Sequence, residues 1–464
     1  MKLNNYSFSF SETNGYEIFT NFKFLISKLY FLSLQKKYLM KNICLYFEIH
    51  QPIELKRYRF FDIGFDHYYY DDFQSEERIR NVSLRSYLPA NQAIMEMIRQ
   101  NDGKFRCAFS ISGVALDMFE NFAPEVIESF QELSKTGCVE FLAEPYCHSL
   151  ASVFNAEEFE IQIQQHAAKI FTLFGKKPTT LCNSELIYSD EIGEMVARLG
   201  FKTMLIDEAK HVMGWKSPNY VYNHATINKL KLLVRNFKLS DDISFRFSDR
   251  AWQNFPLKAE TYIKWIAAMP EKETVINIWM GYEAFGIFNN ADSGIFNFLK
   301  SLPAFSFENG INFALPSEIT KTQDSAGALF VPYPMSWSGN DKNLTVWTGN
   351  DLQQEALNKL YAVSERVHLC SDKPLLRDWL VLQTADYFRF MSHTDSDYNR
   401  FESPYEAFIN YMNILADFLE RVDEQYPTTV ENEELNELLK TIYNQDKEIE
   451  NLQQQIQKLK KRKN

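Results

Sequence analysis

The chain has 464 residues, of which 45% are hydrophobic and 24% charged, a balance that is ordinary for a globular protein with a large core. The formal net charge of -12 argues against nucleic acid and anionic membranes as partners, because both require a basic surface. No window offers about 18 uncharged apolar residues, so the sequence predicts no membrane-spanning helix.

The first 39 residues contain one apolar stretch, "NFKFLISKLYFLSL" at 21–34. Lys23 and Lys28 interrupt it, and no small-residue cleavage site follows, so the stretch does not read as a secretory signal. Met40 stands directly before the first clear strand. We therefore expect residues 1–39 to be an N-terminal extension with little structure.

From residue 40 to about 305, short apolar runs alternate with segments of helical length. Apolar strands separated by helices are typical of a parallel sheet that is buried on both faces, and seven such units favour a barrel-like α/β domain. Chemistry in such barrels lies at the carboxyl ends of the strands. The predicted strands are "NICLYFEI" at 42, "FRCAFSI" at 105, "CVEFLA" at 138, "PTTLCNS" at 178, "FKTMLI" at 201, "KLLVRN" at 231 and "TVINIWM" at 274.

The six cysteines form no CxxC pair, and several lie within the apolar runs. This usage predicts buried, reduced thiols rather than a disulfide framework, and hence a cytoplasmic protein.

The pattern changes in the C-terminal region, residues 306–427, where three segments repeat apolar residues at helical spacing. They begin at residues 352, 375 and 405, and we expect them to pack as a helical bundle against the barrel until Pro427. Residues 430–464 then place apolar side chains on alternating three- and four-residue steps, which predicts a coiled coil able to join copies of the chain. A lone solvated helix is the alternative.

Four of the predicted strand ends carry His or Glu, which would converge on one mouth of a barrel. The spacing lacks the HxH or HExxH patterns of a metal site, no GxSxG motif supports a serine hydrolase, and no Gly-rich phosphate loop is visible. Carboxylates with histidine, arginine and many aromatic residues fit carbohydrate chemistry instead. The residues at these strand ends are His50, Glu144 with His148, Glu185 and Glu283.

Seven motifs carry a resemblance to a known family: "HQP", "GCVEFLAEPYCHSL", "CNSELIYSD", "LVRNFKLSDDISFRFSD", "GYEAFG", "LQTADYFRFM" and "SPYEAFINYMNIL". Over residues 42–425 the chain resembles glycoside hydrolase family 57, in its α-amylase branch. The resemblance implies an incomplete seven-stranded β/α barrel followed by a helical domain. It also implies retaining chemistry on α-1,4-glucans or maltooligosaccharides without a required organic cofactor, while the spacing noted above predicts no metal.

Matched by position to the family's motifs, Glu185 corresponds to the nucleophile and His50 to the histidine of the adjoining sugar subsite. The other matched positions imply substrate binding or closure of the site: His148, Arg235, Asp241, Asp242, Glu283, Trp379 and Asp386.

Two positions depart from the family's pattern. Gly281 stands where the family has the acid/base aspartate, and Tyr387 stands where the amylase branch has histidine. Three interpretations remain open: Glu283 substitutes for the missing acid, the site is a slow hydrolase or transglycosylase, or the protein binds glucans without turning them over. We expect a glycoside hydrolase with an impaired acid/base.

Overall fold

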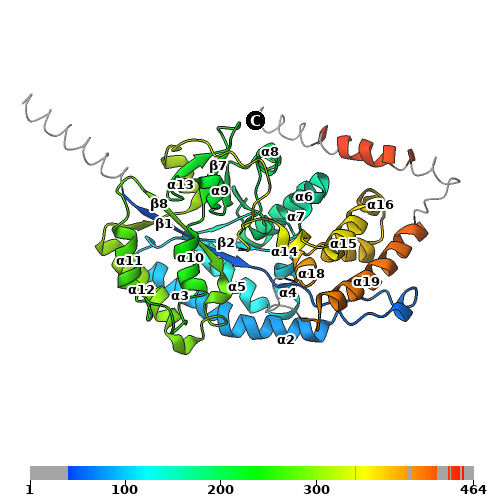
Figure 1. Cartoon of the computed structure of the whole chain (residues 1–464), viewed down its shortest axis with the longest axis horizontal. Coiled ribbons are helices and arrows are strands. Elements are labelled where there is room, and N and C mark those ends of the chain that lie inside the picture. The colour runs from blue at the N-terminus through cyan, green and yellow to red at the C-terminus, as the bar shows by residue number, and fades with distance from the viewer. Residues whose placement is uncertain are drawn as a thin grey trace, which may run out of the picture.

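The structure is a computed structural model that describes residues 40–339, 341–393, 400–425, 437–438, 440–449 and 452–453. The fold is mixed α/β and is built around parallel strands (Figure 1). The strands are β1 (Asn42–Ile49), β2 (Cys107–Ile111), β3 (Val139–Phe141), β4 (Thr180–Cys182), β5 (Thr203–Ile206), β6 (Val221–Asn223), β7 (Lys231–Val234), β8 (Val275–Gly281) and β9 (Asn312–Phe313).

The strands form two sheets. In one sheet the order is β3-β2-β1-β8, with β9 beside the start of β1, and every pairing is parallel. In the other the order is β4-β5-β7-β6, and only β6 runs antiparallel. Two isolated parallel bridges connect the sheets: Ala143, just after β3, pairs with Leu181 of β4, and Arg235, just after β7, pairs with Asn277 of β8.

Each of the seven segments predicted as strands overlaps an observed strand. The two further strands, β6 and β9, have three and two residues, too few for a periodic pattern to develop.

Helices cover the strands, whose side chains are buried almost throughout. Amphipathic spacing accounts for these helices, since each turns an apolar stripe toward the sheets. The longer ones in this part of the chain are α2 (Asp72–Val82), α3 (Leu88–Gln100), α4 (Gly113–Phe122), α5 (Pro124–Lys135), α7 (Ala156–Phe174), α8 (Asp190–Arg198), α10 (Phe237–Ser244), α11 (Ala259–Ala267) and α12 (Ile295–Glu308).

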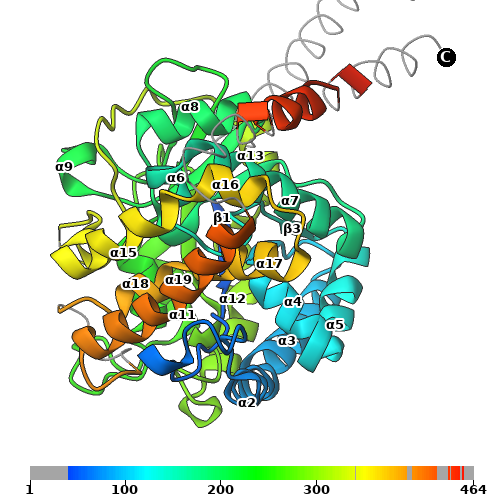
Figure 2. The same cartoon turned by 90° about the vertical axis from the view of Figure 1, so that its right-hand side faces the viewer.

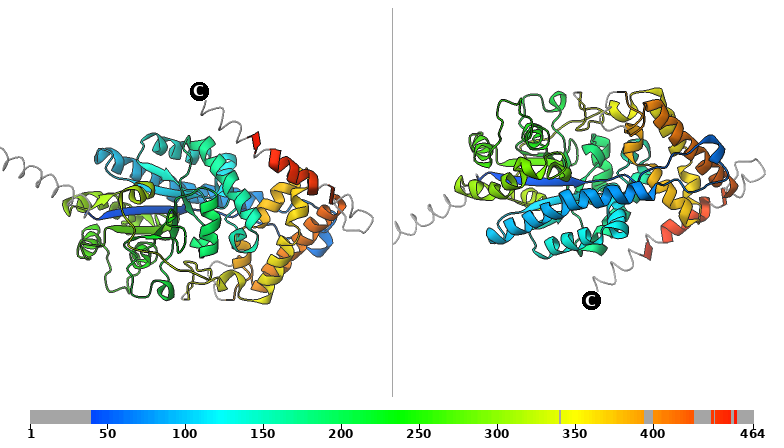
Figure 3. Two further views of the ribbon diagram at one scale, coloured as in Figure 1. Left: turned by 90° about the horizontal axis from the view of Figure 1, so that it is seen from above. Right: turned by 90° about the horizontal axis from the view of Figure 1, so that it is seen from below.

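The C-terminal helices gather at one end of the strands. Figure 2 looks onto these helices with β1 behind them, and both views of Figure 3 place them beyond the head of the β1 arrow. They are α14 (Thr345–Thr348), α15 (Asp351–Tyr361), α16 (Ser364–His368), α17 (Lys373–Leu382), α18 (Ala385–Arg389) and α19 (Pro404–Gln425).

The second predicted helical segment is broken where α17 gives way to α18. At the break, Thr384 bridges Ser149, and the backbone N–H of Ala385 donates to the carbonyl of His148 at 3.1 Å. The interruption docks the helical region onto the loop after β3. It also places Asp386, in the first turn of α18, over the strand ends.

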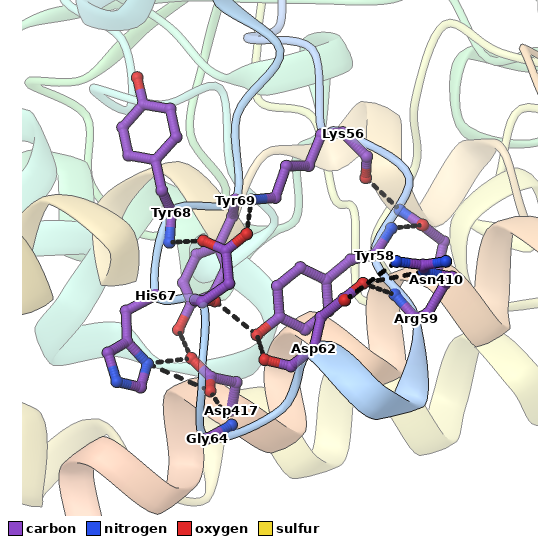
Figure 4. A network of polar contacts seen from close by, with 11 residues as sticks. Lys56, Tyr58, Arg59, Asp62, Gly64, His67, Tyr68, Tyr69, Asn410 and Asp417 are labelled. Carbon is purple, nitrogen blue, oxygen red and sulfur yellow. Dashed lines mark hydrogen bonds and ion pairs between the residues drawn. The ribbon is translucent and has the colours of Figure 1, made fainter.

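A loop after β1 is tied to α19 by the buried carboxylate of Asp417 (Figure 4). Asp417 accepts hydrogen bonds from the Tyr69 hydroxyl at 2.5 Å and the Gly64 backbone N–H at 2.7 Å, and it lies 2.9 Å from His67 Nδ1. The pKa of Asp417 is lowered, because these three partners outweigh the burial that would raise it. This loop therefore forms a fixed part of the fold.

All six cysteines are buried and free of disulfides. Within the described part of the chain, no helix is both long and apolar enough to cross a membrane. Residues 1–39 and Pro427 lie outside the described residues, so the structure does not test the predictions made for them.

The described residues of the tail, between 437 and 453, are helical. Lys440 pairs with Glu365 at 2.8 Å, and the ring of Tyr443 stacks on His368, so this helix lies beside α16. Four of the regularly spaced apolar residues of the tail, which would form the seam of a coiled coil, are exposed: Leu438, Ile442, Ile449 and Leu452.

Candidate active site

One cavity of about 210 Å³ collects most of the predicted site residues at the carboxyl ends of the strands. Its lining includes residues of β1, β8, α2 and α18 and of the segments that follow β3, β4 and β7. All four strand ends expected to converge contribute to the cavity, although Glu144 itself does not line it. The predicted residues that line the cavity are His50, His148, Glu185, Arg235, Gly281, Glu283 and Asp386.

Glu185 follows β4 in a short turn with an unusual backbone. Its φ of 54° and ψ of 24° are left-handed, and Leu186 shares this with a φ of 52°. Such conformations cost on the order of 1–3 kcal/mol and concentrate at functional sites. Trp337 holds the residue twice, since its backbone N–H donates to the Glu185 carbonyl at 3.2 Å and its indole N–H to carboxylate Oε2 at 2.6 Å. The Glu185 carboxylate is thus fixed toward the cavity.

Two stacked histidines adjoin this carboxylate. The ring centroids of His50 and His148 are 4.3 Å apart with 16° between the planes. His50 is oriented by Ser112 Oγ at 2.7 Å and by Asp386 Oδ2 at 2.9 Å, one on each ring nitrogen. His148, whose φ of 55° is also left-handed, brings Nε2 to 3.6 Å from Glu185 Oε1. The helical region and the sheets therefore meet on this pair of rings.

The surroundings shift the pKa values of Glu185, His148 and Asp386 in different directions. Burial alone would raise the pKa of Glu185, but His148 and Arg389 outweigh it and the pKa is lowered. Burial works against the charged form of His148, yet the carboxylates around it raise its pKa well above the ordinary value. The pKa of Asp386 is lowered despite burial, chiefly by His50. The site thus favours two carboxylates and an imidazolium.

The carboxyl group of Glu48 also lines the cavity, and it was not predicted from the sequence. Glu48 lies on β1 two residues before His50, and residues i and i+2 share a face of a strand, which is the signal that could have identified it. Its side chain is 15% exposed, and Oε1 lies 4.0 Å from His148 Nε2. Burial raises the pKa of Glu48 well above its ordinary value, and the charge of Glu185 raises it further against the opposing effect of His148.

Glu283 lies in the same cavity but is tied down by donors. Gln51 Nε2 donates to its Oε1 at 3.0 Å, and the Tyr87 hydroxyl donates to the same oxygen. Burial raises the pKa of Glu283, and the bond from Tyr87 opposes this. Gly281 is extended, with φ of -61° and ψ of 137°, and a Cβ there would lie 3.1 Å from Glu283 Oε2. Gly281, at the end of β8, pairs in register with Glu48 on the neighbouring strand β1.

Arg235 provides a buried positive charge in the cavity wall. Its guanidinium lies over the rings of Trp279 and Trp337, at 5.2 and 5.8 Å from the centroids. It is held by Asp207 at 3.2 Å and by Asp241 at 2.5 Å. Asp241 therefore fixes Arg235, and it does not itself line the cavity.

Two other matched residues, Trp379 and Asp242, and the departing residue Tyr387 contact the protein itself and do not line the cavity. The indole N–H of Trp379 donates to buried Glu158 at 3.1 Å, so the structure does not bring Trp379 to the cavity. Asp242, on α10, pairs with Arg246, which lies just after that helix ends. Tyr387, which replaces the family's histidine, donates its hydroxyl to the Ile53 carbonyl at 2.7 Å from a buried position. That bond ties α18 to the loop after β1.

Aromatic rings border the opening of the cavity. Phe245 and Phe288 are exposed and line it, and Phe245 stacks on Trp337 with centroids 6.4 Å apart. Apolar ring faces beside carboxyl and imidazole groups suit a sugar, whose ring packs on aromatics while its hydroxyls form hydrogen bonds. Among the described residues, no three or more His, Cys, Asp or Glu side chains are grouped so as to hold a metal ion.

Comparison with known proteins gives a family match and curated and structural relatives. The family model described as "Glycosyl hydrolase family 57" matches residues 44–332. The chain is 34% identical over 396 residues to a protein of Methanocaldococcus jannaschii named "Putative alpha-amylase", which covers 80% of this chain and 83% of that protein.

Solved structures share the fold at low sequence identity. The branching enzyme of GH57 type from Pyrococcus horikoshii has a TM-score of 0.61 at 14% identity, over 87% of this chain and 95% of its own. The 4-alpha-glucanotransferase from Thermococcus litoralis has a TM-score of 0.60 at 15% identity, over 82% and 60%. For the alpha-amylase AmyC from Thermotoga maritima the TM-score is 0.55 at 13% identity, over 87% and 96%.

Proposed function

The chain belongs to glycosyl hydrolase family 57, and from this membership we propose that it is an α-amylase-like glycoside hydrolase acting on α-1,4-glucans. The observation that carries the proposal is the Glu185 carboxylate, which faces the cavity with its Oε2 bonded to the Trp337 indole at 2.6 Å. In the proposed retaining reaction, Glu185 attacks the anomeric carbon of the sugar and forms a glucosyl ester.

The surroundings of Glu185 support this role. Since His148 and Arg389 lower its pKa, the carboxylate is in its nucleophilic form. His50 and Asp386, joined at 2.9 Å, offer hydrogen-bonding atoms for sugar hydroxyls, and Arg235 and Glu283 line other parts of the wall. Sugar binding by these residues is part of the proposal.

The proposal extends to the architecture of the chain. The strand pairings and the two connecting bridges support an incomplete seven-stranded β/α barrel over 40–305, with a helical region over 306–427 that completes the groove. Six free, buried thiols are compatible with a cytoplasmic protein. The exposed seam of the tail supports a coiled coil between two copies over 430–464. Light scattering of the full chain and of a chain lacking 430–464 tests this pairing, which a monomeric full chain would exclude.

Two substrates test the enzymatic proposal. An α-glucosyl fluoride needs the nucleophile and little protonation of its leaving group, whereas maltooligosaccharides also need a proton donor. We expect the protein to release fluoride, and we expect Glu185→Gln to lower this rate by about 10⁴-fold or more, since loss of a catalytic nucleophile can cost about 10⁶-fold. Equal release by Glu185→Gln and the unmodified protein would reject Glu185 as the nucleophile.

The glycine at position 281 favours a second candidate, a glucan-binding protein without turnover. It predicts that neither substrate is consumed while maltooligosaccharides still bind, as titration calorimetry can measure. Replacing Trp337 by alanine should then weaken binding, because its ring lines the cavity beside Glu185.

A further inference from the structure

The structure brings a second carboxyl group to the place where the family's acid is missing. Gly281 on β8 pairs in register with Glu48 on β1, so the two residues are neighbours across the sheet. Glu48 shares the cavity with Glu185, and the two carboxyl groups approach the same atom, His148 Nε2, at 4.0 and 3.6 Å. Their oxygens are separated by no more than the sum of these distances, a limit that includes the about 5–5.5 Å used by retaining glycosidases.

We propose that Glu48 is the acid/base of this site and replaces the aspartate that Gly281 lacks. The inference rests on the proposed function, with Glu185 as the nucleophile. It differs from the interpretation in which Glu283 substitutes for the missing acid, because it assigns the proton to a residue of the neighbouring strand β1.

The environments of the two carboxyl groups support different protonation states. Burial and the nearby charge of Glu185 raise the pKa of Glu48, whereas His148 and Arg389 keep the pKa of Glu185 low. A pair of carboxyl groups whose pKa values are pushed apart is the arrangement that assigns one as acid and the other as nucleophile.

Glu283 is less suited to the same task. Burial raises the pKa of Glu283 as well, but its Oε1 accepts hydrogen bonds from Gln51 and Tyr87, which oppose that rise and hold the carboxyl group in place. No donor among the described residues lies within hydrogen-bonding distance of the Glu48 carboxyl, which is therefore available to a substrate.

The proposed reaction balances in two steps. In the first, a carboxylate oxygen of Glu185 bonds to the anomeric carbon while the bond to the glycosidic oxygen breaks, and the Glu48 proton moves to that oxygen. The leaving sugar departs with a hydroxyl group, and Glu48 becomes a carboxylate. In the second, Glu48 takes a proton from water, the water oxygen bonds to the anomeric carbon, and the ester to Glu185 breaks. Both carboxyl groups return to their starting states.

Glu48→Gln keeps the shape of the side chain and removes its acid and base functions. We expect turnover of maltooligosaccharides to fall about 10²-fold or more, the range that general acid catalysis contributes. With α-glucosyl fluoride, the variant should release the first equivalent of fluoride at nearly the normal rate and then turn over slowly, because water lacks its base.

Azide tests whether the slow turnover is due to the missing base, since azide attacks the ester without losing a proton. Adding azide should restore fluoride turnover in Glu48→Gln and yield α-glucosyl azide, an effect that a merely structural role would not produce. Glu283→Gln is the matched comparison, and its slower turnover should not respond to azide.

The outcomes separate the two proposals. If the unmodified protein consumes neither substrate, the enzymatic function fails, and the role of Glu48 fails with it. If it consumes the fluoride but not maltooligosaccharides, the nucleophile stands and Glu48 is not a proton donor. If it consumes both, equal activity of Glu48→Gln, or azide rescue confined to Glu283→Gln, overturns the assignment.

Discussion

Gly281→Asp would restore the family's carboxylate beside Glu48, and the geometry allows its effect to be worked out. The backbone at 281, with φ of -61° and ψ of 137°, is open to any L residue, so the substitution introduces no backbone strain. The new Cβ would lie 3.1 Å from Glu283 Oε2 and 3.9 Å from Phe288 Cε2. Glu283 therefore has to shift by a few tenths of an ångström.

The added carboxyl group would also meet the charge of Glu283. Two carboxylates about 4 Å apart repel by about 4 kcal/mol at an effective dielectric constant of about 20. This corresponds to about three pKa units, enough to keep one of the two groups protonated near neutral pH. The variant should thus hold a new acid opposite Glu185.

The expected gain depends on whether the site already has an acid. If Glu48 donates the proton, Gly281→Asp alone should change the kcat/KM for maltooligosaccharides by less than about tenfold. In the Glu48→Gln background the same substitution should raise it about 10²-fold or more. Melting curves of all three variants should accompany the kinetics, so that unfolding is not mistaken for loss of catalysis.

The opposite pattern would refute the reasoning. A gain of about 10²-fold or more from Gly281→Asp alone would mean that the unmodified site lacks an acid. Absence of any gain in a folded Glu48→Gln, Gly281→Asp double variant would mean that position 281 no longer faces the reacting bond.

Two indole hydrogen bonds and one buried carboxyl group can also be tested singly. Trp337→Phe removes the indole donor to Glu185, a charge-assisted bond worth roughly 1.5–3 kcal/mol, and should lower kcat by about 10–100-fold with little change in melting temperature. Trp379→Phe leaves Glu158 short of a donor, so it should lower the melting temperature and leave glucan affinity unchanged by calorimetry. Burial raises the pKa of Glu208 to about 7, so its contribution to stability is present below pH about 4.5 and lost as pH rises through 7; denaturant titrations should lose this dependence in Glu208→Gln. The first argument fails if Trp337→Phe is unstable but fully active, and the second fails if Trp379→Phe binds glucan more weakly. The third fails if Glu208→Gln leaves the pH dependence of stability unchanged.

Much of the fold could be predicted because the strands are apolar and bounded by polar residues. The apolar run at 275–280 shows both its strand and the Glu283 that follows it, because a buried parallel strand leaves a strong local signal. The break between α17 and α18 left no such signal, since apolar residues continue at helical spacing across it. It depends on a distant contact, that of Ala385 with His148.

From the strand pattern alone, the site was predictable only where a polar residue follows a strand. His50 and Glu185 do so, and both line the cavity. Glu48 lies inside a strand, where a single acidic residue among apolar ones does not indicate a site. Its position beside Gly281 depends on the register between β1 and β8, which the sequence does not show. Trp337 could not be placed from its sequence, because its bond to Glu185 joins segments 152 residues apart.

The most direct test of the account is to find the glucosyl ester itself. Glu48→Gln should form the ester with α-glucosyl fluoride and hydrolyse it slowly, so rapid acid quenching should preserve it for peptide mass spectrometry. The account predicts one added glucosyl group on Glu185 at up to one per protein, and none in a Glu48→Gln, Glu185→Gln double variant. Fluoride release with an unmodified Glu185, or with the sugar attached to Glu283 instead, would contradict it.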